Sequence, residues 1–217
     1  TPNRSATAAT GGTLPSPRLW GVAPAQVPNL YDAITTVSRD GVVVDVYETR
    51  FGVRTLDYDP NQGLFVNGSH VKIQGVCNHH DLGALGAVVN GRGKERQLEI
   101  LAELGANAIR TAHNPEAPVL YELADRKGFL IMDEAFDVWS TGKTALDHHL
   151  FFEDWHEQDL RAMIRRDRNH PSVFIWSIGN EIPQQSDAGA GPTVRAINDL
   201  VRDEDPTRPT VSGMNSA

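Results

Sequence analysis

The feature that most restricts the fold is a regular alternation of short apolar strands and amphipathic helices in the second part of the chain. The expected strands are residues 71–76, 107–111, 129–133, 173–178 and 210–213. The expected helices are residues 94–104, residues 118–127, a long helix around 160–164 that ends at Asn169-His170-Pro171, and residues 193–203. Alternation at this spacing predicts an α/β fold with a parallel sheet covered by helices.

Two architectures are compatible with this alternation: a doubly wound sheet and a (β/α)8 barrel. The phosphate-binding patterns of doubly wound folds, G-x-G-x-x-G and G-x-x-x-x-G-K, are absent from the sequence. A complete barrel requires eight strands and roughly 250 residues. If the sheet is a barrel, the five expected strands make up only part of it.

The residues before about position 60 have a different character, with β-branched residues and turn signals. Two apolar segments, residues 34–37 and 42–47, flank Asp40-Gly41, a strong signal for a β-hairpin turn. Further short strands are expected at residues 50–54 and 64–68. These strands indicate part of an antiparallel sandwich and are too few for a complete one.

Composition narrows the classes of partner. The formal net charge is -8 and the pI is about 5.4, which argues against nucleic acid or an anionic membrane as the main partner. No segment approaches the roughly 20 apolar residues of a membrane helix, and residues 1–13 lack the pattern of a signal peptide. Cys77 is the single cysteine, so an internal disulfide is excluded, while the cellular compartment stays open.

Polar and ionisable residues gather where the expected strands end, which is where barrel enzymes place their catalytic groups. The four groups are residues 77–81 (CNHHD), 110–115 (RTAHNP), 133–139 (DEAFDVW) and 177–181 (SIGNE). The turns from helix to strand carry mainly stop signals, such as Gly105 and Gly128. This asymmetry predicts a functional face at the strand ends and a structural face at the strand starts.

Two of these segments carry a family resemblance. Residues 167–181, DRNHPSVFIWSIGNE, are similar almost position for position to the acid/base signature of glycoside hydrolase family 2. Residues 107–115, continuing to 125–134, resemble the other signature of that family, with a departure at Asn114, where many members carry Tyr. Residues 19–20, 28–31 and 50–54 look like the end of the immunoglobulin-like domain that precedes the barrel of this family.

The resemblance implies three divisions of the chain. Residues 1–15 are a low-complexity segment, residues 16–60 are the C-terminal part of an immunoglobulin-like β-sandwich, and residues 61–217 are the N-terminal part of a TIM-barrel catalytic domain. The expected fold is therefore a partial (β/α)8 barrel, with about five of its eight strands, preceded by part of a sandwich.

The implied activity is retaining hydrolysis of terminal β-galactosides, in which two carboxyl groups stand about 5–5.5 Å apart. The resemblance makes Glu181 the acid/base, and Asn180 beside it would hydrogen-bond the sugar. Partial burial at the end of its apolar strand and a nearby second carboxylate are expected to raise the pKa of the acid. The nucleophile of the family is a Glu near the end of the seventh strand, beyond these residues, so the chain alone is expected to be inactive.

Other residues are assigned with their alternatives left open. Arg110 and His113 are expected either to bind sugar or to support Glu181, and His79 is the expected substrate contact in its cluster. Trp139 is a candidate face for sugar stacking, while Trp176, in the middle of a strand, is expected in the core. Asp133 and Glu134 are expected to shape the site, and Glu181 itself has the alternative of a solvated loop acid.

No metal and no cofactor are expected. Adjacent residues such as His79-His80-Asp81 rarely converge on one ion, and the loop at residues 136–142 lacks the Glu and His with which some β-galactosidases of this family hold magnesium. The expected partner is a carbohydrate substrate, with assembly into a homo-oligomer open. β-Glucuronidase, β-mannosidase and a non-catalytic carbohydrate-binding protein are the alternative functions.

Overall fold

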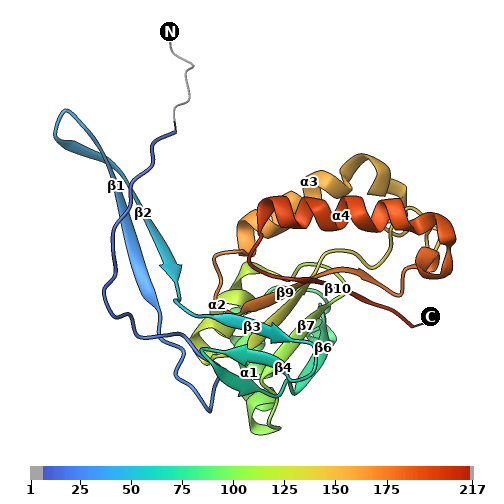
Figure 1. The fold of residues 1–217 in the computed structure, drawn as a ribbon, viewed down its shortest axis with the longest axis horizontal. Helices are drawn as coiled ribbons and strands as arrows, with labels where there is room; N and C mark the ends of the chain where they lie inside the picture. The colour runs from blue at the N-terminus through green and yellow to red at the C-terminus, as the bar shows by residue number, and fades with distance from the viewer. Residues whose placement is uncertain (1–6, 216–217) are drawn as a thin grey trace.

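The computed structural model describes residues 7–215, and its central element is a five-stranded parallel sheet (Figure 1). The strands of this sheet are β6 (Gly75–His79), β7 (Ala108–Ala112), β8 (Leu130–Glu134), β9 (Val173–Asn180) and β10 (Thr210–Gly213). The helices that connect them are α1 (Gly91–Glu103), α2 (Pro118–Lys127), α3 (His149–Asp167) and α4 (Gly191–Glu204). Three short 3₁₀ helices lie in the loops: η1 (Gly83–Leu85), η2 (Pro183–Ser186) and η3 (Ala188–Ala190).

The order of the strands distinguishes the two architectures that the sequence left open. Neighbours in the sheet follow chain order from β6 to β10, and every pair is parallel. A doubly wound sheet reverses its strand order at a switch point, whereas a barrel adds each strand to the same side. The predicted partial (β/α)8 barrel is therefore confirmed.

The predicted bounds of four strands are within one or two residues of the observed ones, but the first predicted strand, residues 71–76, is wrong. Val71 belongs to β5 (Ser69–Val71) and pairs antiparallel with Leu64. The parallel strand β6 begins only at Gly75, which faces Ala108. A Cβ at Gly75 would lie 3.2 Å from the Cβ of Ala108, so glycine permits this close approach.

Helix ends follow the predicted signals most clearly at α2, whose observed bounds equal the predicted ones. Pro118 occupies the first turn, where a missing N–H costs nothing. Gly128 ends the helix with a φ of 73°, and its N–H donates to the carbonyl of Ala124.

The predicted hairpin is formed by β1 (Tyr31–Arg39) and β2 (Val42–Phe51), which are antiparallel. Its turn residues Asp40 and Gly41 both have positive φ angles, 51° and 79°, as a type I′ turn requires. The hairpin extends away from the parallel sheet (Figure 1), and almost all of its residues are exposed on both faces. The strand predicted at residues 50–54 is present only as far as Phe51.

A three-stranded antiparallel sheet, β3 (Leu56–Asp59), β4 (Gly63–Val66) and β5, packs against the starts of the parallel strands. The residues of this second core are Trp20, Val22, Leu64, Val66, Ala108, Leu130 and Phe174. The predicted domain boundary after residue 60 falls in the turn between β3 and β4, and it stays a prediction. Of the predicted low-complexity segment, residues 1–6 lie outside the described residues, and 7–15 form no helix or strand.

Side chains donate to main-chain carbonyls at this end of the sheet. Arg54 donates to Pro171 and Val173 at 2.5 and 2.6 Å, and the indole N–H of Trp20 donates to Asp125 at 2.8 Å. The hydroxyl of Tyr58 donates to Phe174. These bonds fix the start of β9 and the last turn of α2, which agrees with the predicted structural role of this face.

The main core lies between the sheet and its helices, and Trp176 is completely buried within it, as predicted. In the range 7–215, no helix combines the length and the apolar character that crossing a membrane requires.

Candidate active site

Glu134, at the end of β8, is the centre of a polar cluster at the strand ends. Its side chain is fully buried and accepts hydrogen bonds from Arg110 Nε at 2.9 Å and from Ser177 Oγ at 2.5 Å. His113 Nδ1 lies 2.8 Å from its other oxygen. A buried carboxylate is costly unless it is paired and hydrogen-bonded, and donors from β7, the loop that follows it, and β9 supply this pairing.

Asn180, the last residue of β9, joins the same cluster and is only 5% exposed. Its Oδ1 accepts from Arg110 Nη2 at 2.7 Å, and its Nδ2 donates to Asp137 Oδ1 at 2.8 Å. Two partners of opposite character therefore define the orientation of the amide. Desolvation acts to raise the pKa of Asp137, but hydrogen bonds from Lys143 and Asn180 outweigh it, and the pKa lies below its usual value.

Glu181 follows immediately, and its side chain is exposed. Within the described part of the chain, its carboxylate has no hydrogen-bond or ion-pair partner. The partial burial expected from the sequence is therefore not observed, because the sheet is open between β10 and β6 and the chain leaves β9 at this residue. Its φ is 43°, rare for a residue with a side chain, and its N–H donates to the carbonyl of Gly213 in β10 at 2.5 Å.

The two histidines predicted for the site, His79 and His113, lie together, whereas the neighbouring His80 does not join them. His79, at the end of β6, is exposed, and its ring meets that of His113 edge to face with centroids 5.0 Å apart. His80 instead turns toward Glu116, 3.4 Å away. Arg110 and His113 both contact Glu134, so the residue that they support is Glu134 rather than Glu181.

Two predicted site residues lie outside the cluster. Trp139 is 3% exposed, packs in the main core, and donates its indole N–H to the carbonyl of Ile178 at 2.9 Å, so neither face of its ring is open to a sugar. Asp133 is fully buried on the helix side of β8, because successive strand residues point to opposite faces. It accepts from the hydroxyl of Tyr121 at 2.7 Å, and burial, followed by the charge of Asp167, raises its pKa well above the usual value.

Sequence reasoning assigned no role to four residues that complete the cluster. Ser177 binds Glu134, and Thr111 Oγ1 accepts the N–H of Glu134 at 2.8 Å. Asp137 and Lys143 contact Asn180 from the loop between β8 and α3. Ser177 and Thr111 could have been found from their places in strands near the polar ends, whereas no sequence signal marks Lys143.

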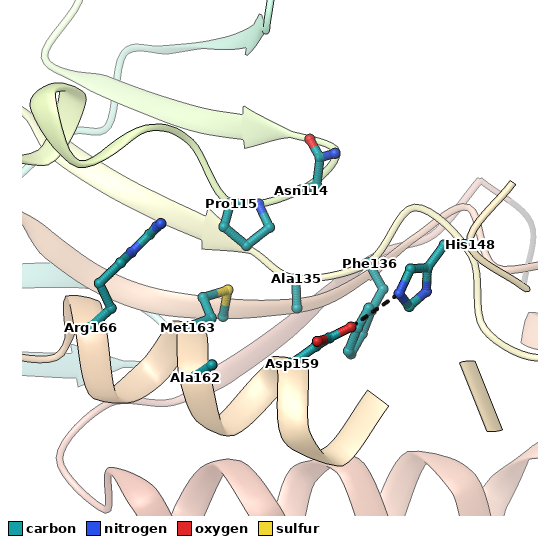
Figure 2. A pocket seen from close by; sticks show the side chains of 9 residues that line it. All are labelled: Asn114, Pro115, Ala135, Phe136, His148, Asp159, Ala162, Met163 and Arg166. Atoms are coloured by element: carbon teal, nitrogen blue, oxygen red, sulfur yellow. Dashed lines mark hydrogen bonds and ion pairs between the residues drawn. The ribbon is translucent and has the colours of Figure 1, made fainter. Parts of the chain in front are cut away.

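A cavity of about 370 Å³ lies beside this cluster, between α3 and the loops that follow β7 and β8 (Figure 2). Its lining is largely apolar, with Pro115, Phe136 and Met163, and Asn114 stands at its rim. None of Arg110, Glu134, Asn180 and Glu181 lines it. The cavity is therefore separate from the cluster at the strand ends. In the range 7–215, no three His, Cys, Asp or Glu side chains are grouped as metal ligands would be.

Two family models match the chain in sequence. Residues 60–215 match "Glycosyl hydrolases family 2, TIM barrel domain", and residues 2–54 match "Glycosyl hydrolases family 2". Together, these matches cover the five parallel strands and the exposed hairpin.

Individual relatives and structures agree with these matches. The chain is 53% identical over 179 residues to a β-galactosidase of Bacteroides ovatus, which covers 82% of this chain and 21% of the relative. It is 35% identical over 204 residues to a β-glucuronidase of Bacteroides fragilis, covering 92% and 28%. The crystal structure of a glycosyl hydrolase family 2 member from Bacteroides cellulosilyticus superposes with a TM-score of 0.88 at 39% identity, covering 93% of this chain and 26% of that one.

The chain thus spans between about a fifth and slightly more than a quarter of the length of these three proteins. The match over residues 60–215 includes every strand that contributes to the polar cluster, from Arg110 on β7 to Gly213 on β10. With that extent of similarity in sequence and in fold, the chain belongs to glycoside hydrolase family 2.

Proposed function

We propose that the protein containing this chain is a retaining glycosidase that hydrolyses terminal β-galactosides, with Glu181 as its acid/base. The observation that carries this proposal is the pairing at the end of β9 of a fixed amide, Asn180, with an unpartnered carboxyl group, Glu181. In the first step Glu181 donates its proton to the departing glycosidic oxygen while a second carboxylate attacks the anomeric carbon. In the second step it takes a proton from the water that releases the sugar.

Asn180, Arg110, His113 and His79 are the proposed sugar-binding residues. Arg110 and His113 both hold Glu134, so their remaining donors have fixed directions. Preorganised donors of this kind favour the transition state because they need no reorganisation during the reaction. Glu134 and Asp133 are the proposed site-shaping residues. Glu134 does so within the cluster, and Asp133 does so from the opposite face of β8.

A neutral sugar is favoured over a glucuronide by the charges at the strand ends. Arg110 and Lys143 are already paired with Glu134 and Asp137, at 2.8 and 2.7 Å. The carboxylate of a glucuronide is best bound by a cation that is free to pair with it, whereas a galactoside needs no such cation. The 53% identity to a β-galactosidase points in the same direction. A β-glucuronidase or β-mannosidase activity is the alternative within the family.

The proposed nucleophile lies outside this chain. At the described strand ends, Asp133 and Glu134 are both buried and engaged in hydrogen bonds, so neither is free to attack an anomeric carbon. The chain alone is therefore expected to lack hydrolytic activity, and every assay below uses the full-length protein.

The substrate class is tested with a panel of nitrophenyl β-glycosides. Efficient hydrolysis of the galactoside, with little of the glucuronide or the mannoside, is the expected result. Hydrolysis of the glucuronide alone would contradict the choice of sugar.

The role of Glu181 is tested with Glu181→Gln and a series of leaving groups. The kcat/KM for alkyl or phenyl galactosides, whose leaving groups need a proton, should fall by about 10²–10⁴-fold, because kcat/KM reports the first step. The kcat/KM for activated aryl galactosides should fall much less, because their departure needs little proton donation, although kcat falls for every substrate as the second step loses its base. Equal losses in kcat/KM on both kinds of substrate would reject the acid role.

A further inference from the structure

Lys143 belongs to the loop between β8 and α3, and its ammonium group lies against the residue that precedes Glu181. Lys143 Nζ donates to Asp137 Oδ1 at 2.7 Å and to the carbonyl oxygen of Asn180 at 2.8 Å. Asp137 Oδ1 also accepts from Asn180 Nδ2 at 2.8 Å. The three residues therefore form a closed ring of hydrogen bonds that holds both the side chain and the main chain of Asn180.

The carbonyl that Lys143 contacts belongs to the peptide group joining Asn180 to Glu181. The N–H of the same peptide group donates to the carbonyl of Gly213. Both polar atoms of this peptide are thus held, one by Lys143 and one by β10. A fixed peptide plane defines the direction in which the Cα–Cβ bond of Glu181 leaves the chain, and the φ of 43° at Glu181 is a conformation that needs such support.

The loop that presents Lys143 is itself anchored. Asp147 Oδ2 accepts the N–H groups of Lys143 and Thr144, both at 2.8 Å. Farther along, His148 stacks on Phe136 with centroids 5.5 Å apart and pairs with Asp159 of α3 at 3.3 Å (Figure 2). The lysine side chain is only 26% exposed. Because the loop is anchored, the lysine side chain loses less conformational freedom when it forms its hydrogen bonds to Asp137 and Asn180.

We propose that Lys143 is a positioning residue for the general acid: it holds the Asn180–Glu181 peptide so that the carboxyl group of Glu181 is aimed at the glycosidic oxygen. This role rests on the proposed function of Glu181. A lysine that only fastens the loop would affect folding, whereas a positioning lysine affects the step that needs the proton.

The test compares three variants of the full-length enzyme. Lys143→Met removes both hydrogen bonds, and Lys143→Arg keeps a cation that can donate to both acceptors. Lys127→Met is the matched control, because Lys127 is also 26% exposed and ion-paired, with Glu95 and Glu99 at 3.3 and 3.5 Å, away from the strand ends. Each variant is assayed with methyl or phenyl β-galactoside and with an activated dinitrophenyl β-galactoside.

Lys143→Met should lower kcat/KM for the poor leaving group by on the order of 10- to 100-fold, the effect of a small misplacement of a catalytic group. The loss in kcat/KM with the activated substrate should be several-fold smaller, KM for the poor leaving group should change less than about twofold because the residues that contact the sugar are unchanged, and Lys143→Arg should recover part of the loss. The Lys127→Met enzyme should match the wild type. Equal losses on both substrates, or no loss, would overturn the positioning role.

Glu181→Gln in the same assay separates the two proposals. If Glu181→Gln shows the leaving-group dependence and Lys143→Met behaves like Lys127→Met, the role of Lys143 is wrong while the acid role stands. If Glu181→Gln lacks that dependence, both proposals are overturned.

Discussion

Arg110 on β7 and Asn180 on β9 are joined by a 2.7 Å hydrogen bond that passes over the end of the intervening strand β8. The same Nη2 atom lies 2.8 Å from Glu134 on β8. The guanidinium group of Arg110 therefore connects the ends of three adjacent strands by hydrogen bonds. Substitution of Arg110 tests the whole cluster.

Arg110→Met should leave the buried charge of Glu134 with fewer donors and lower the free energy of unfolding by about 3 kcal/mol. Combining it with Glu134→Gln, which removes that charge, should restore much of the stability without restoring activity. Chemical denaturation and kcat/KM of the single and double variants measure the two effects. A double variant as unstable as the sum of the single variants would contradict the pairing.

Gly213→Ala should disturb the same guanidinium. A Cβ at Gly213 would lie 2.6 Å from Arg110 Nη2, so Arg110 would have to move away from Glu134 and Asn180. We expect kcat/KM to fall on the order of tenfold or more through this displacement, and Tm to fall as well, because the buried Glu134 loses donors as it does in Arg110→Met. Gly12→Ala, where a Cβ meets open space, is the control. Unchanged kinetics in Gly213→Ala would show that Arg110 can relax without cost.

Substitution of Trp139 distinguishes a core residue from a sugar platform. Trp139→Ala should lower the free energy of unfolding by about 3–5 kcal/mol, as for other buried aromatic residues. Trp139→Phe should lose mainly the hydrogen bond to Ile178, costing roughly 1–3 kcal/mol. Thermal unfolding and KM are measured together. A raised KM at unchanged stability would restore the sugar-stacking role.

Acid should weaken the contact between α3 and α4 through Glu204. Hydrogen bonds from Arg165, and next from Arg161, lower the pKa of Glu204 to about 2, below the roughly 4.3 of an unfolded chain. A carboxyl group whose pKa is lower in the folded state than in the unfolded chain stabilises the fold at pH values above its unfolded pKa. For Glu204 this stabilisation is lost as the pH falls from about 4.3 toward 2.

Glu204→Gln should therefore lower Tm at pH 7 and have less effect at pH 3. Asp203→Asn, at a carboxylate that is 69% exposed, should change little at either pH. An effect of Glu204→Gln that does not depend on pH would contradict the ion pairs.

Chelation should leave the activity of the full-length enzyme unchanged. Asp137 supplies the carboxylate of the loop beside Asn180, and Lys143 already neutralises it at a distance of 2.7 Å. The loop at residues 136–142 has neither Glu nor His. Activity is measured before and after dialysis against EDTA. Loss of activity that magnesium restores would show that this prediction is wrong.

Much of the fold could be predicted because its signals are local. Apolar segments, the proline and glycine at the ends of α2, and the Asp40-Gly41 turn each act over a few residues. The error at β6 arose because Val71 is as apolar as the strand that follows, and only its antiparallel partner, Leu64, shows that it belongs to another sheet.

The location of the site could be predicted from the sequence, but the hydrogen-bond partners of its side chains could not. Strand ends show where polar side chains gather, whereas the face to which each side chain points decides its partners. Asp133 and Glu134 are neighbours in sequence and lie on opposite faces of β8, and Trp139 turns inward to reach Ile178. Lys143 meets Asn180 across 37 residues of sequence, a contact that no spacing rule reveals.

The hydrogen bonds to the start of β9 and to α2 have a consequence for how such enzymes diversify. Trp20, Arg54 and Tyr58 all donate to backbone carbonyls, at Asp125, Pro171, Val173 and Phe174. A carbonyl is present whichever amino acid occupies the position, so mutations on the accepting side leave this scaffold intact. Mutagenesis libraries, or natural drift, can therefore explore new specificities at the strand ends while these hydrogen bonds keep the opposite end of the sheet in place.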